Sequence, residues 1–277
     1  MRYQFLRFPN GLGKAITLSY DDACRHDVRF SETITRAGLK CTFNATRIAQ
    51  LTIEQMKENF LDRGHEIAVH GANHLAQGAA RPVRGIRDVL DCRLQLEEQL
   101  GIIIRGMAYP DTGIRRFSNG ANYENIKQYL QDLDIVYARS LGADNNSFML
   151  PTDWYNWIPT AHHANPKLME WIDEFVNMDV SKLYITRQDP KLFYLWGHSY
   201  EFDRDGWELL DKICEKLSGH EDVWYATNME IYEYVKAYDS LVYSADASRV
   251  YNPTLVDVWL NRDGVVSKIA SGETVKF

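Results

Sequence analysis

The sequence predicts an α/β protein: a parallel barrel of about seven strand–helix units, followed by a small β-rich appendage. Short apolar runs and amphipathic stretches alternate about seven times between residues 14 and 237. This alternation is typical of parallel strands joined by helical crossovers. From residue 239 onward, only short apolar runs between turn residues remain. We therefore expect a barrel over residues 1–238 and a β unit over residues 239–277.

The elements of the barrel follow from apolar patterning and from residues that begin or end helices. Thr52 and Pro82 suit helix starts, because threonine caps the first turn and proline fits the first helical position. Gly38, Gly64 and Gly101 suit helix ends, where glycine adopts a left-handed conformation at little cost. Strands are expected at 14–20, 39–44, 67–69, 102–109, 135–138, 192–196 and 223–226, and helices at 25–37, 52–62, 82–100, 121–131, 166–177, 206–217 and 229–237.

The last 39 residues change pattern. Apolar runs at 241–243, 255–259, 265–269 and 274–277 are separated by turn residues, and 262–264 and 271–273 suit hairpin turns. This pattern favours a small antiparallel unit. A structural cap on the barrel is its expected role, and glycan binding through Tyr243, Tyr251 or Trp259 is the alternative.

Composition excludes several classes of partner. The formal net charge of −7, with no arginine–lysine cluster, argues against a nucleic-acid partner. The sequence contains no run of 18 apolar residues, so it predicts no membrane span. Residues 1–10 contain no apolar signal region. As it stands, the sequence predicts a cytoplasmic protein, whereas a secreted or periplasmic protein would need a leader removed from its start.

The four cysteines form no C-x-x-C pair and are expected to be buried thiols. Oligomeric state is left open.

Acidic and histidine side chains recur just after predicted strands. Asp21 and Asp22 follow the first strand, His70 follows the third, Asp111 follows a later one, and His198 follows the strand at 192–196. The carboxyl ends of parallel barrel strands converge on one face, where active sites are built. We therefore expect these side chains to meet there.

Three of these residues suit a metal ion. His70 and His74 are four residues apart and can share one ion, although a pair of solvent-facing loop histidines is the alternative interpretation. Asp22 completes a three-ligand set that leaves a position for water, as catalytic zinc requires. Zinc is the expected ion, with cobalt, nickel or manganese as alternatives. Asp21 is the candidate general base and His198 the candidate acid for hydrolysis of an amide or ester.

These motifs resemble the polysaccharide deacetylases of the NodB-homology type, carbohydrate esterase family 4. The family motif T-F-D-D-G is similar to residues 18–23, H-[ST]-x-x-H is similar to residues 70–74, and a late apolar–histidine motif is similar to residues 195–198. The resemblance implies an irregular (β/α)7 barrel of NodB type. It also implies metal binding by Asp22, His70 and His74, with Asp21 as base and His198 as acid.

The third and fourth family motifs are altered. The third, R-x-P-Y, corresponds to Ala108, Tyr109, Pro110 and Asp111, so the arginine that pairs with the base is missing. Arg139 is a candidate substitute, and a surface salt bridge is the alternative. The backbone N–H of Asp111 remains available for the oxyanion.

The family's fourth motif orients the acid and forms part of the pocket wall. It is expected in residues 153–157, with Asp153, Trp154 and Trp157 as its candidates. His163 and its neighbour His162 are candidates to line the pocket or touch the metal, and an exposed loop pair is the alternative.

The sequence thus predicts a metal-dependent deacetylase that removes N- or O-acetyl groups from a carbohydrate or an acetylated small molecule. One alternative is a C–N hydrolase of the same superfamily that acts on a non-sugar amide. The other is a carbohydrate-binding protein with a dead site, which the presence of both Asp21 and His198 argues against.

Overall fold

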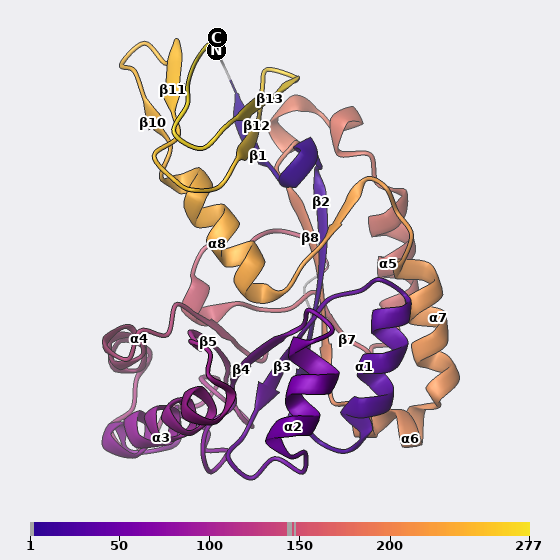
Figure 1. Ribbon diagram of the computed structural model, residues 1–277, viewed down its shortest axis with the longest axis vertical. Helices are drawn as coiled ribbons and strands as arrows, with labels where there is room; N and C mark the ends of the chain where they lie inside the picture. Colours follow the sequence, from indigo (N-terminus) through magenta and orange to yellow (C-terminus); the bar gives the residue numbers. More distant parts are fainter. Residues whose placement is uncertain (1–2, 143–145, 147) are drawn as a thin grey trace.

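The computed structural model describes residues 3–142, 146 and 148–277. Its centre is one parallel sheet with the strand order β6-β5-β4-β3-β2-β8-β7, and β9 pairs with β2. Every pairing within this sheet is parallel. The sheet curls into a half-barrel flanked by helices, which confirms the predicted fold class (Figure 1).

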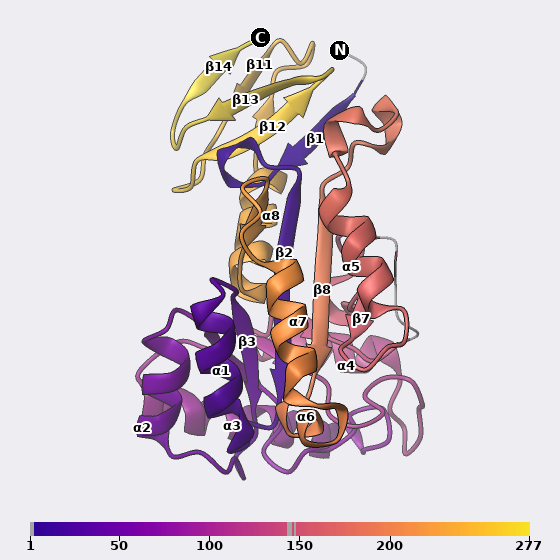
Figure 2. The ribbon, with the colours of Figure 1, turned by 90° about the vertical axis from the view of Figure 1, so that its right-hand side faces the viewer.

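The barrel strands lie close to their predicted positions. The seventh strand, β7, was not predicted because it contains only two residues of an otherwise irregular stretch. The eight strands are β2 (Lys14–Asp21), β3 (Cys41–Ala45), β4 (Glu66–Val69), β5 (Gly106–Ala108), β6 (Tyr137–Arg139), β7 (Ala161–His162), β8 (Lys191–Gly197) and β9 (Val223–Tyr225). β2 and β8 run side by side through the middle of the molecule (Figure 2).

Three of the helices, α2, α4 and α8, begin at side-chain caps. Thr52, Asn122 and Thr227 each accept a backbone N–H and form a capping box. The helices are α1 (His26–Arg36), α2 (Ile53–Met56), α3 (Pro82–Leu100), α4 (Tyr123–Asp132), α5 (Leu168–Asn177), α6 (Phe202–Asp205), α7 (Trp207–Leu217) and α8 (Asn228–Asp239). The single helix expected over 52–62 is α2 followed by a π-helical turn, Lys57–Leu61. Short 3₁₀ turns cover Pro9–Gly11, Trp154–Asn156, Val180–Lys182, Ile185–Arg187 and Ser199–Glu201.

The C-terminal segment forms antiparallel strands, as its pattern indicated. β10 (Val242–Tyr243), β11 (Arg249–Tyr251) and β14 (Thr274–Lys276) make one small sheet. β12 (Val258–Arg262) and β13 (Val265–Ile269) make a second sheet, which β1 (Gln4–Arg7) joins by pairing with β12. The N-terminal strand therefore lies with the C-terminal unit and not in the barrel sheet (Figure 2). The division at residue 238 stays a prediction.

Burial follows the predicted pattern. The main apolar cluster fills the space between the sheet and helices α1, α3, α5 and α7, and a smaller cluster lies under α8. All four cysteines are buried and unpaired, as expected. Within the described residues, no helix combines the length and the apolar character that a membrane crossing requires.

Candidate active site

The candidate site lies at the carboxyl ends of the central strands. β2 ends at Asp21, β4 is followed directly by His70, and β8 is followed directly by His198. β3 lies between β2 and β4, and β8 pairs with the other side of β2. Parallel register therefore brings these polar side chains to one edge, as the sequence predicted.

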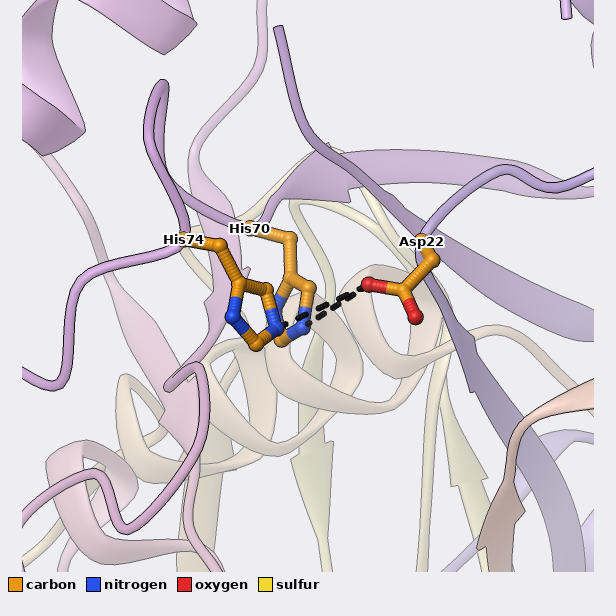
Figure 3. A group of neighbouring side chains, drawn as sticks. All are labelled: Asp22, His70 and His74. Atoms are coloured by element: carbon orange, nitrogen blue, oxygen red, sulfur yellow. Dashed lines mark ion pairs between the residues drawn. The ribbon is translucent and has the colours of Figure 1, made fainter. Parts of the chain in front are cut away.

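Asp22, His70 and His74 converge on one point (Figure 3). Oδ1 of Asp22 lies 3.8 Å from Nε2 of His70 and 3.6 Å from Nε2 of His74. The three ligand atoms lie within 4.8 Å of one another, a spacing compatible with one shared ion. Asp22 and His74 both adopt left-handed backbone conformations, with φ of 83° and 53°. Such strain in non-glycine residues is typical of functional sites.

The tautomer of His70 fits a metal ligand. Its Nδ1 lies 2.9 Å from the carbonyl oxygen of Ala108, which can only accept, so Nδ1 carries the proton. The lone pair of Nε2 then faces Asp22. Nε2 is buried and has no hydrogen-bond partner among the described residues. A bound cation would satisfy this atom, and a backbone carbonyl behind the second ring nitrogen is typical of metal-binding histidines.

Asp88 of α3 holds the loop that carries the two histidines. Its Oδ1 accepts the backbone N–H of Asn73 at 2.7 Å, and its Oδ2 accepts that of Leu75 at 3.3 Å. Gly71 has φ of 76°, and a side chain there would collide with the Asp88 carboxylate. The glycine in place of the family's Ser/Thr therefore gives Asp88 its close approach.

Asp21 is buried beside a guanidinium, an amide and two imidazole rings. Its Oδ2 lies 2.5 Å from Nη2 of Arg139 and 3.8 Å from Nε2 of both His70 and His198, and its Oδ1 accepts from Nδ2 of Asn44 at 2.8 Å. Burial alone raises the pKa of Asp21, but Arg139 and the two histidines outweigh burial and hold that pKa below its ordinary value. The carboxylate is therefore ionised and available as a base.

Arg139 occupies the place of the missing third-motif arginine. It ends β6, and its Cα partner on β5 is Ala108, the residue that stands where the family has arginine. Its guanidinium is fully buried and stacks over the Trp196 ring at 4.6 Å. The guanidinium is thus supplied from the neighbouring strand, and the surface salt bridge considered as the alternative is not what the structure shows.

His198 is held by Glu201. Oε2 of Glu201 lies 3.3 Å from Nδ1 of His198 and 3.1 Å from Nε2 of His162. Burial lowers the pKa of His198, but the Glu201 bond and the charges of Asp21 and Glu201 outweigh it and raise that pKa overall. A protonated His198 with Nε2 facing Asp21 suits the role of general acid.

A second histidine cluster is a hydrogen-bond network and does not have the tautomers of a metal site. Ligand atoms of His162, His163 and Glu201 also lie close together. However, Nδ1 of His162 accepts the backbone N–H of Ala164 at 3.1 Å, so in the neutral ring the proton is on Nε2. This proton points to Glu201, which leaves no Nε2 lone pair for a cation.

The catalytic cavity has a volume of about 280 Å³. Tyr109 and Asp111, both predicted, lie in its wall, and Pro110 joins them in the chain. The backbone N–H of Asp111 donates to no described residue, so it is available to an oxyanion. The complete lining is Asp21, His70, His74, Tyr109, Asp111, Thr112, Arg115, Leu141, Trp196 and His198.

The fourth-motif candidates lie elsewhere. Asp153 accepts from Tyr123 at 2.6 Å and Lys127 at 2.8 Å and caps a 3₁₀ turn, so it does not orient His198. Trp157 is buried against Tyr137 and Tyr194, and Trp154 packs on Trp157, so neither lines the cavity. The two tryptophan rings belong to the apolar cluster under α8 instead.

His163 is neither exposed nor in the cavity wall. It is buried, and its Nδ1 lies 3.2 Å from the Tyr20 hydroxyl. Its ring also packs against Gly197, where any side chain would collide with it. Burial and the neighbouring His162 lower the pKa of His163 to about 3, so the ring is neutral.

Five residues that contact the candidate site or line its cavity were not predicted from the sequence: Glu201, Asn44, Asp88, Trp196 and Arg115. Glu201 had a usable signal, because it lies three residues after His198 at a turn, where a side chain reaches back. Asn44 had one too, as a polar residue at the end of a buried strand. Asp88 and Arg115 gave no local signal, since charged residues on helices and loops are ordinarily solvated.

Comparisons with known proteins show a family match over part of the chain and a shared fold. Residues 9–137 match the family model described as polysaccharide deacetylase, and none of the curated proteins matches the chain. A Mycobacterium smegmatis protein shares the fold at a TM-score of 0.56 and 16% identity, covering 86% of this chain and 96% of its own. A family 4 carbohydrate esterase from Streptomyces lividans shares it at a TM-score of 0.50 and 12% identity, covering 78% and 93%.

Deacetylase PplD of Streptococcus pyogenes matches less of the molecule. The alignment covers 46% of this chain and about half, 55%, of the PplD chain. The identity is 21% and the TM-score is 0.39. The family model covers the strand ends that carry Asp21, Asp22, His70 and His74, and the shared fold covers the rest of the half-barrel. Residues 9–137 therefore match the polysaccharide deacetylase family, which agrees with the resemblance of their motifs to the NodB-homology group.

Proposed function

We propose that this chain is a metal-dependent carbohydrate deacetylase that uses Asp22, His70 and His74 as its metal ligands. The observation that carries the proposal is the buried Nε2 of His70, which has no hydrogen-bond partner among the described residues and faces Asp22 and His74. When bound there, a divalent ion supplies Lewis-acid activation of water and of the acyl carbonyl. Zinc suits this mixed nitrogen–oxygen set, and cobalt, nickel or manganese are alternatives.

The reaction assigned to the site is hydrolysis of an acetyl amide or ester. Asp21 takes a proton from the attacking water, whose oxygen bonds to the acyl carbon. The backbone N–H of Asp111 donates to the oxyanion that forms. Nε2 of His198 then donates a proton to the departing nitrogen or oxygen as the bond to the acyl carbon breaks. Acetate and the deacylated sugar are the products.

Substitution of the base separates catalysis from metal binding. D21N keeps the shape of the side chain but removes its basicity, so acetate release should fall by roughly 10²–10⁴-fold. Metal content, measured by mass spectrometry of the metal-loaded protein, should remain that of the wild type. Active D21N would overturn the base assignment.

A matched control and a second variant complete the experiment. D153N changes the predicted but displaced fourth-motif aspartate in the same way and should leave turnover close to wild type. H74A removes a ligand and should lose metal and activity together. A wild-type protein that binds no divalent ion would contradict the metal assignment.

The substrate panel tests the alternative of a non-sugar amide. Acetylated oligosaccharides are compared with linear and cyclic amides under the same conditions. Preference for a sugar supports the carbohydrate assignment, whereas turnover of amides alone favours the C–N hydrolase alternative.

A further inference from the structure

Arg115 is a positively charged residue in the wall of the catalytic cavity. It lies on the loop between β5 and α4 and lines the same cavity as Asp21, His70 and His198. Its side chain is exposed, and no described carboxylate lies within ion-pair distance of it. The guanidinium is therefore available to a ligand.

A second group of arginines lies on the other flank of His74. Arg47, Arg84 and Arg87 line a cavity of about 250 Å³ that also includes Asn73 and Leu75, the residues on either side of His74. Arg47 donates to the neutral side chain of Asn73 at 3.2 Å. Arg87 forms an ion pair with Asp91, with 3.8 Å between Nη2 and Oδ2.

Two acidic residues, Asp88 and Asp91, line this second cavity together with the three arginines. Both oxygens of Asp88 accept backbone N–H groups of the histidine loop, which occupies its carboxylate. Three arginines and two carboxylates leave one net positive charge in the cavity beside His74, in a chain whose formal net charge is −7. Local positive potential of this kind attracts anionic ligands against an unfavourable overall charge.

We propose that the substrate is an acetylated sugar that carries a negatively charged group, which Arg115 binds while the acetyl group lies at the metal site. The proposal rests on the deacetylase function proposed above. Guanidinium has a planar fork of donors that matches carboxylate and phosphate groups, so either group satisfies the chemistry. Asp111, four residues earlier, lies in the same cavity wall.

Paired substrates test this assignment. kcat/KM is measured for an acetylated xylo-oligosaccharide, an acetylated oligogalacturonate and N-acetylglucosamine 6-phosphate, which are neutral, carboxylate-bearing and phosphate-bearing. Wild type should prefer at least one anionic substrate, and R115A should lower the anionic-to-neutral ratio roughly ten- to a hundredfold, as expected for a lost charged hydrogen bond. Comparison of the carboxylate-bearing with the phosphate-bearing substrate shows which anionic group the site binds.

R116A is the matched control. It removes the same charge from the next residue, which is exposed but does not line the cavity, and should keep the ratio within about twofold of wild type. Preference for the neutral substrate, or an equal effect of R115A and R116A, would overturn the proposal.

Failure of the proposed deacetylase function can be distinguished from failure of the anion-site proposal. If no substrate releases acetate, the proposed function fails, and binding of oligogalacturonate and of the 6-phosphate sugar is then measured by calorimetry. Weaker binding to R115A than to R116A would still support an anion site, and equal binding to both would overturn it.

Discussion

Asp21 owes its ionised state to neighbours from several strands. Arg139 comes from β6, Asn44 from β3, His70 from the end of β4 and His198 from the end of β8. A buried carboxylate without such partners would take up a proton and lose its basicity. The base is therefore a property of the cluster and not of the residue alone.

Removal of Arg139 should cost both stability and activity. R139A leaves Asp21 buried without its cation, a change that destabilises proteins by about 3–5 kcal/mol. Urea unfolding at neutral pH measures this loss. In the double variant D21N/R139A the uncompensated charge is gone, so its stability should recover most of the difference. Equal unfolding of R139A and wild type would show that the pair does not stabilise the fold.

Replacement of Glu201 should affect the acid step selectively. E201Q keeps the side-chain shape but removes the charge that raises the pKa of His198, so the alkaline limb of the kcat profile should move to lower pH. We expect kcat to fall about tenfold or more with little change in KM. D205N is the control, because Asp205 approaches His163 at 3.6 Å and not His198. An unchanged pH profile in E201Q would contradict the positioning role.

At the scale of elements, His65 links β3 to α1 immediately before β4. Its Nδ1 accepts the backbone N–H of Cys41 at 3.3 Å, and its Nε2 lies 2.9 Å from the Thr35 hydroxyl. The neutral ring satisfies both bonds, whereas a proton on Nδ1 would face the Cys41 N–H. Burial, with help from Lys40 and Arg63, lowers the pKa of His65 to about 4.

This lowered pKa predicts a loss of stability in acid. Above the unfolded-state pKa of 6.5 the neutral ring contributes fully, and the contribution is lost as pH falls toward about 4. The shift corresponds to at most about 3 kcal/mol in the free energy of unfolding. Unfolding titrations between pH 7 and 4 should show a shallower decline for H65Q than for wild type. Parallel declines would contradict this role.

At the scale of the whole molecule, the two ends of the chain are joined through one sheet. β1 pairs with β12, and the Tyr234 hydroxyl in α8 donates to the carbonyl of Arg7 and accepts the N–H of Trp259. Leu6 is buried with α8 in the smaller barrel cluster. The C-terminal unit thus contacts the barrel through both β1 and α8.

Truncation tests whether residues 1–238 are an independent domain. A chain that ends at residue 238 should lose the partner strand of β1, expose apolar side chains of α8 and unfold at a lower temperature than the full chain. Thermal unfolding and size-exclusion chromatography measure this. A truncated chain with unchanged thermal stability and deacetylase activity would instead establish the predicted domain boundary.

Local sequence patterns predict most of the strands and helices and most of the candidate metal and catalytic residues. The strand–helix alternation, the helix caps and the residues placed after strand ends are properties of short segments, so Asp21, Asp22, His70, His74 and His198 could be found from the sequence. The register of neighbouring strands could not, because it depends on packing between segments far apart in the chain. Tertiary structure alone placed Arg139 beside Ala108, Glu201 behind His198, and Trp154 and Trp157 in the core.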